Sequence, residues 1–131
     1  MGSVTLSTLE KRITYWKKKL ELHAWEFQIE VVEAPDGKPQ SNACVTPATD
    51  YESAVIQFKD EWIENEDKEI IDRGIVHELL HVLDHERVLA EHFVCDRLSP
   101  SVESMYHERL EHEEEWFIEK IARIIVELDK S

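Results

Sequence analysis

The sequence is poor in cysteine, glycine and proline. It contains two cysteines, three glycines and four prolines among 131 residues. So few glycines and prolines exclude a collagen-like chain and a low-complexity chain. Cys44 and Cys95 stand alone rather than in a CxxC pair. We therefore expect reduced thiols and a cytoplasmic protein, without a disulfide framework.

Long apolar segments are also missing. No uncharged apolar run in the sequence approaches the roughly 20 residues that a transmembrane helix needs, and no apolar segment follows the N-terminus to form a secretory signal. Hydrophobic residues make up 42% and charged residues 34% of the chain, which is a globular mixture. We expect one soluble domain over residues 1–131 that has no contact with a membrane.

Basic residues are also few relative to acidic ones. The chain has 15 Lys and Arg against 29 Asp and Glu, a formal net charge of −14. Because nucleic-acid binding through phosphates needs clusters of Lys and Arg, we expect no nucleic-acid partner. The basic residues gather early: residues 1–23 carry five basic and two acidic groups, a net of +3, which leaves −17 for the remainder.

Hydrophobic periodicity predicts an α+β fold. A capping-box pattern at residues 7–10 and apolar residues at helical spacing indicate a helix over 8–22. Strict alternation predicts a half-buried strand at 25–31, and two short strands follow near 42–46 and 52–58. A second helix begins near residue 68 and ends between residues 84 and 95. A third begins at residue 100 and runs to about residue 128. The order predicts an N-terminal helix, a small and mostly antiparallel sheet, and two helices.

The most informative segment is His77-Glu78-Leu79-Leu80-His81, an HExxH motif. Residues four apart on a helix lie on one face, with about 6 Å of axial rise between them. Both imidazoles can therefore bind a single Zn²⁺. Glu78 lies beside them, where a carboxylate can take a proton from an activated water. The alternative is that both histidines are surface or satisfied core groups of a partly buried helix.

A catalytic zinc needs a third protein ligand, which we expect from the last helix. With Ile121 at the centre of its apolar face and 100° per residue, Glu114 lies within about 20° of that centre. A carboxylate on an apolar face is costly unless it is paired or binds a cation, so Glu114 is the favoured ligand. Its alternative role is a salt bridge. The neighbouring glutamates lie about 80–120° away from the centre of the apolar face. They are Glu111, Glu113 and Glu115.

Two further residues of this helix are candidates for the site. His107 lies one heptad before Glu114 on the same face and is the second choice for the third ligand. His107 or Tyr106 could instead donate a hydrogen bond to the oxyanion that develops during hydrolysis. An ordinary half-buried tyrosine is the simpler reading of Tyr106.

These features resemble the zincin metallopeptidases, and the later glutamate resembles their gluzincin branch. In its short length the chain resembles the compact, single-domain HExxH proteins of phages and bacteria more than the two-domain zincins. The resemblance implies that His77, His81 and Glu114 bind zinc and that Glu78 is the general base in hydrolysis of a peptide or protein substrate. It also implies that residues 54–58, in the strand before the motif helix, pair with that substrate.

One feature departs from the gluzincin pattern. Gluzincins often carry an acidic residue four positions after the ligand glutamate, and after Glu114 this position holds Ile118.

The acidic composition also allows a function of another class. A non-catalytic interaction or decoy protein could present its negative charge to a basic partner. In that case the HELLH segment packs the helix or binds a structural metal.

Overall fold

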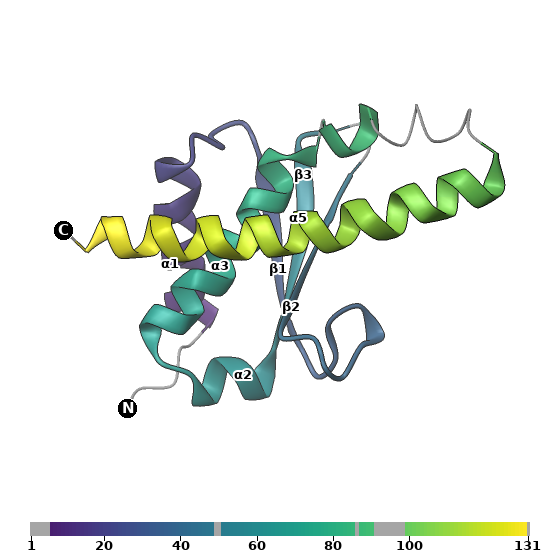
Figure 1. Ribbon diagram of the computed structural model, residues 1–131. Helices are drawn as coiled ribbons and strands as arrows, with labels where there is room; N and C mark the ends of the chain where they lie inside the picture. Colours follow the sequence, from purple (N-terminus) through teal and green to yellow (C-terminus); the bar gives the residue numbers. More distant parts are fainter. Residues whose placement is uncertain (1–5, 49–50, 86, 91–98, 131) are drawn as a thin grey trace.

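The computed structural model describes residues 6–48, 51–85, 87–90 and 99–130, apart from the side chains of Tyr106 and Leu110. Its elements, in chain order, are α1 (Leu6–Lys19), β1 (Glu26–Val32), a 3-10 turn (Pro35–Gly37), β2 (Ala43–Pro47), β3 (Ser53–Lys59), α2 (Asp60–Asn65), α3 (Lys68–Leu83) and α5 (Pro100–Asp129) (Figure 1). The α+β class is confirmed, with its N-terminal helix and long C-terminal helix. The short helix α2 was not expected. None of the helices in the described ranges is long and apolar enough to cross a membrane.

The three strands form a mixed sheet in the order β1-β3-β2. β1 runs parallel to β3, from the pair Glu26 and Ser53 onward, whereas β2 runs antiparallel to β3. The expectation of a mostly antiparallel sheet is therefore wrong. The physical reason is that β3 buries one entire face, through Ala54, Ile56 and Phe58, and so takes the central place. β2 forms a hairpin with β3 on the far side from β1, which leaves β1 and β3 as parallel neighbours.

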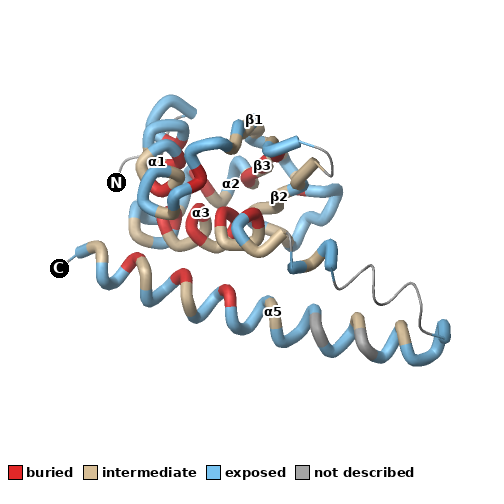
Figure 2. The backbone as a smooth tube through the Cα atoms, turned by 90° about the horizontal axis from the view of Figure 1, so that it is seen from above, coloured by how far each residue is buried: buried red, intermediate tan, exposed pale blue. Residues whose placement is uncertain are grey.

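Helix α3 lies between the sheet and α5 (Figure 2). It packs against β2, α1 and α5. Its apolar residues meet those of α1 and β3 in the main core. That core comprises chiefly Leu9, Ile13, Trp16, Ile56, Phe58, Ile71, Ile75, Val76, Leu79 and Val82.

Polar contacts hold the basic helix α1 on this acidic body. Arg12 donates two hydrogen bonds to the buried carboxylate of Asp72 in α3, at 3.0 Å from Nε and 2.7 Å from Nη2. The Tyr15 hydroxyl donates to the Asp129 carboxylate at the end of α5, 2.8 Å from Oδ2. The first helix therefore contacts both helices that flank the candidate site.

The rotation of α5 about its own axis differs from the expected one. The residues that α5 buries are Ile118, Ala122 and Val126. The buried stretches of α5 face the rest of the molecule in Figure 2. At 100° per residue their centre lies about 100° from Ile121, which the sequence analysis took as the centre of the apolar face. Apolar residues occupy two faces of this helix, and the small Ala122 lets one of them approach α3 closely.

Candidate metal centre

Helix α3 brings His77 and His81 together on one face. Its first turn is capped by Asp67, whose side chain accepts a hydrogen bond from the backbone N–H of Ile70 at 3.0 Å. Most apolar residues of α3 are buried in the core (Ile71, Ile75, Val76, Leu79 and Val82), and the histidines emerge toward α5. Their ring centroids lie 5.1 Å apart, and both side chains are half-buried. The geometry that the HExxH spacing predicts is therefore present.

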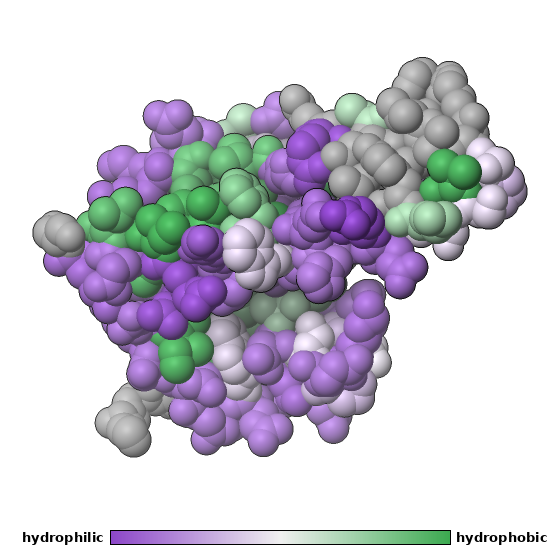
Figure 3. Space-filling view, viewed as in Figure 1, coloured by the Kyte–Doolittle hydropathy of each residue, from purple (hydrophilic) through white to green (hydrophobic). Residues whose placement is uncertain are grey.

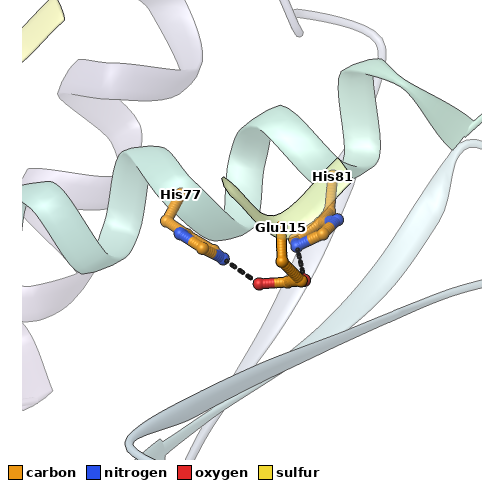
Figure 4. A group of neighbouring side chains, drawn as sticks. All are labelled: His77, His81 and Glu115. Carbon is orange, nitrogen blue, oxygen red and sulfur yellow. Dashed lines mark hydrogen bonds and ion pairs between the residues drawn. The ribbon is translucent and has the colours of Figure 1, made fainter. Parts of the chain in front are cut away.

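Helix α5 places the carboxylate of Glu115 between the two imidazoles (Figure 4). Glu115 Oε2 lies 3.2 Å from Nε2 of His77, and its Oε1 lies 2.8 Å from Nε2 of His81. One donor atom from each of the three residues lies within 4.8 Å of the other two. We call these three residues the His–His–Glu cluster.

Each histidine of the cluster meets a second carboxylate at its other ring nitrogen. Glu119 Oε2 lies 2.8 Å from Nδ1 of His77. Glu114 Oε1 lies 3.4 Å from Nδ1 of His81. A carboxylate at Nδ1 fixes the orientation of an imidazole and leaves Nε2 to bind a metal ion. Both Nε2 atoms point to the same place, beside Glu115.

Charge interactions stabilise the protonated histidines when no metal is bound. Burial disfavours the charged imidazole of His77, but hydrogen bonds to Glu115 and Glu119 and the charge of Glu78 raise its pKa to about 9. The pKa of His81 is also raised, because contact with Glu115 outweighs its burial. The same hydrogen bonds hold the pKa of Glu115 well below its usual range. A metal ion would therefore have to displace protons from the cluster.

Glu78 lies next to the cluster and is not part of it. It is only 8% exposed. Burial raises the pKa of Glu78. The positive charges of His77 and His81 and a hydrogen bond from the backbone N–H of Val45 in β2 lower it, but burial has the larger effect. A buried carboxylate with a raised pKa is suited to accept and return a proton near neutral pH.

A cleft of about 480 Å³ opens over the cluster, between β2, α3 and α5. Many of the residues that line it are polar or ionisable. The residues that line the cleft include Asp36, Lys38, Cys44, Val45, His77, Glu78, His81, His85, His107, Glu111, Glu114 and Glu115. His107 thus lines the cleft together with the motif residues. The side chain of Tyr106, like all of Cys95, lies outside the part of the chain that the structure describes.

The structure favours Glu115 over Glu114 as the third ligand. Glu115 meets Nε2 of both histidines, whereas Glu114 meets only Nδ1 of His81 and also lies 3.5 Å from Arg87. The rotation of α5 explains the difference, because Glu115 lies within about 20° of the centre of the buried face and Glu114 about 80° away.

A signal for this arrangement was present in the sequence. Glu115 precedes the buried residues Ile118, Ala122 and Val126 at intervals of three, four and four residues, which is one helical face. Glu115 and Glu119 are also four apart, the same spacing as His77 and His81. Counted from Glu115, the acidic residue four positions later that gluzincins often carry is Glu119.

The strand expected to pair with a peptide, residues 54–58, has no free edge in the structure. β3 has β1 on one side and β2 on the other along residues 54–58, so its edges cannot accept a peptide. In the described chain β2 pairs with β3 alone, and it lines the cleft. The edge that is open to an extended peptide beside the cluster is therefore that of β2.

The cluster fits a zinc ion in its chemistry and dimensions. Two imidazole nitrogens and one carboxylate oxygen are a common donor set of catalytic zinc. Donors around a tetrahedral zinc at about 2.0–2.1 Å lie roughly 3.3 Å from each other. The distances of 3.2 and 2.8 Å from Glu115 to the histidines are close to this value. The three donor atoms lie within 4.8 Å of one another, so the side chains would have to draw together around the ion.

Comparison with known proteins found no match. No model of a known protein family, no curated protein and no solved structure matches this chain. Function is therefore inferred from the side chains of the cleft.

Proposed function

We propose that this protein is a zinc-dependent metallopeptidase of the small, single-domain, gluzincin-like type. One observation carries the proposal: donor atoms of His77, His81 and Glu115 converge within 4.8 Å, with the buried Glu78 beside them. A structural metal site has no need of a buried carboxylate that binds no metal, whereas hydrolysis needs a general base.

The residues of the cleft would have different roles in hydrolysis. A zinc ion bound by the cluster would polarise the scissile carbonyl and lower the pKa of a water molecule. Glu78 accepts the proton of the attacking water and passes it to the leaving amine. Glu119 and Glu114 hold His77 and His81 in orientation from their Nδ1 side.

The remaining walls of the cleft would bind and polarise the substrate. An extended peptide is held along the open edge of β2, above the cluster. His107 also lines the cleft, and its proposed role is to donate a hydrogen bond to the oxyanion.

The test is peptide cleavage by the zinc-loaded protein, measured by mass spectrometry on a mixed peptide library. We expect Glu78→Gln to keep one zinc per chain and to lose cleavage by a factor of roughly 10²–10⁴. Glu113→Gln is the matched control, since this exposed residue pairs with Arg109 outside the cluster and should cleave normally. Cleavage that survives Glu78→Gln would exclude the proposed mechanism.

One specific observation favours a second function. Each cluster histidine already has carboxylate partners without any metal. HELLH could therefore hold α3 to α5 by ion pairs in a non-catalytic, acidic interaction protein. Elemental analysis separates the two functions: a wild-type chain that takes up no zinc after incubation with the metal would favour the interaction protein.

A further inference from the structure

The second apolar face of α5 is exposed. Phe117 is 59%, Ile124 45% and Leu128 67% accessible to solvent, and Ile121 lies half-buried between them. Figure 3 shows hydrophobic side chains gathered over the end of the molecule where α5 terminates, bordered by hydrophilic ones. We call Phe117, Ile121, Ile124 and Leu128 the apolar seam. An exposed patch of this kind marks an interaction surface.

The spacing of the apolar seam identifies the kind of surface that it fits. Its residues follow one another at intervals of four, three and four, the pattern by which two helices pack along a shared axis. A groove of about 930 Å³ adjoins the apolar seam, between the end of α3 and α5. It is lined by the apolar residues Leu80, Leu83 and Trp116 and by charged residues that include Asp84, Arg87, Glu113 and Glu114. The surface therefore suits a helix with apolar residues at the same intervals, and α5 itself is such a helix.

We propose that the apolar seam pairs with the apolar seam of a second copy of this chain, with the two α5 helices antiparallel. In that arrangement Phe117 of one copy faces Leu128 of the other, and Ile121 faces Ile124. Twofold symmetry repeats both contacts, so every residue of the apolar seam has an apolar partner. The paired segment, residues 117–128, is about 17 Å long.

Charge complementarity favours the antiparallel direction. Lys120 and Glu127 lie seven residues apart along one border of the apolar seam. An antiparallel pair brings Lys120 of each copy to Glu127 of the other. A parallel pair would instead place these charges against the opposite border, which carries Ile118 and Ile125 packed into their own chain. The antiparallel pair therefore forms two opposite-charge contacts that the parallel pair lacks.

The first experiment is sedimentation velocity of the wild-type protein over a range of concentrations. We expect a mass of about 31 kDa at high concentration, twice the 15.4 kDa of one chain. Phe117→Asp should remain monomeric throughout that range. Met105→Asp is the matched control, because Met105 is 72% exposed on the same helix but outside the apolar seam, and this variant should dimerise normally. A monomeric wild type, or a dimeric Phe117→Asp, would overturn the proposal.

The second experiment tests the direction of pairing by charge exchange. Lys120→Glu and Glu127→Lys should each raise the dissociation constant of the dimer by about tenfold, because each turns two attractive contacts into repulsive ones. The double variant carries both exchanges and should return to within about twofold of wild type. Failure of the double variant to recover would refute the antiparallel arrangement. Far-UV circular dichroism is measured for every variant, and an unchanged spectrum shows that the variant is folded.

Discussion

The sharpest prediction concerns four glutamates of α5, each replaced by glutamine. The change keeps the size of the side chain and removes one negative charge. Glu115 contacts Nε2 of both histidines, Glu119 and Glu114 each contact one Nδ1, and Glu113 is exposed and paired with Arg109. The four variants have the same net charge. Differences in zinc affinity among them therefore depend on where the lost carboxylate lies and not on the number of carboxylates.

The structure sets the expected order of zinc affinities. Structural zinc sites with four ligands bind with about 10–16 kcal/mol, or roughly 2.5–4 kcal/mol for each ligand. Glu115→Gln should therefore weaken zinc binding by roughly 10²–10³-fold. Loss of a carboxylate that orients a metal-binding histidine lowers metal affinity by about 10–100-fold. We expect a loss in this range for Glu119→Gln and a loss near its lower end for Glu114→Gln. Glu113→Gln should change the affinity by less than about twofold.

The assay is competition for zinc with a chromophoric chelator at neutral pH and constant ionic strength. Far-UV circular dichroism verifies that each variant is folded. A greater loss in Glu114→Gln than in Glu115→Gln would refute the rotation of α5 on which the cluster depends. Equal losses in all four variants would mean that net charge alone determines the affinity.

Three further predictions concern stability. Because the folded pKa of His77 is raised to about 9 from 6.5, its contribution to the stability of the metal-free protein is full below pH 6.5 and disappears as the pH rises through 9. Urea unfolding in the presence of a chelator should show this decline, and a constant stability from pH 6 to 9 would contradict it. Gly74→Ala should lower the free energy of unfolding by about 1 kcal/mol or more, because the new methyl group would overlap the ring of Trp62. A variant more stable than wild type would mean that Trp62 moves aside without cost. Asp72→Asn should cost about 3 kcal/mol, since it leaves the partly buried Arg12 without its charge partner. Urea unfolding measures this loss as well, and a change below about 1 kcal/mol would show that the pair contributes little.

Local periodicity determined much of the fold. Apolar residues at intervals of three and four mark α1, α3 and α5 because one helical face must be buried. Alternation marks β1 and β3 for the corresponding reason in a strand. The convergence of His77 and His81 also follows from the sequence, since residues four apart on a helix must lie on one face.

Strand pairing was decided only by the tertiary structure. Nothing local in β1 specifies whether its neighbour is β2 or β3, because pairing depends on residues distant along the chain. The central place of β3 makes the β1 pair parallel and leaves β2 at the edge beside the cleft. The strand expected from the sequence to pair with a peptide, β3, is therefore the one strand with no free edge in the described sheet.

The carboxylate that completes the His–His–Glu cluster depends in the same way on the packing of helices. Apolar residues occupy two faces of α5, and hydrophobicity by itself does not show which face is buried. Contact with α3 buries Ile118, Ala122 and Val126, and this rotation turns Glu115 toward the histidines. The two histidines are set by their spacing on one helix, whereas the carboxylate that joins them is set by how a second helix packs against it.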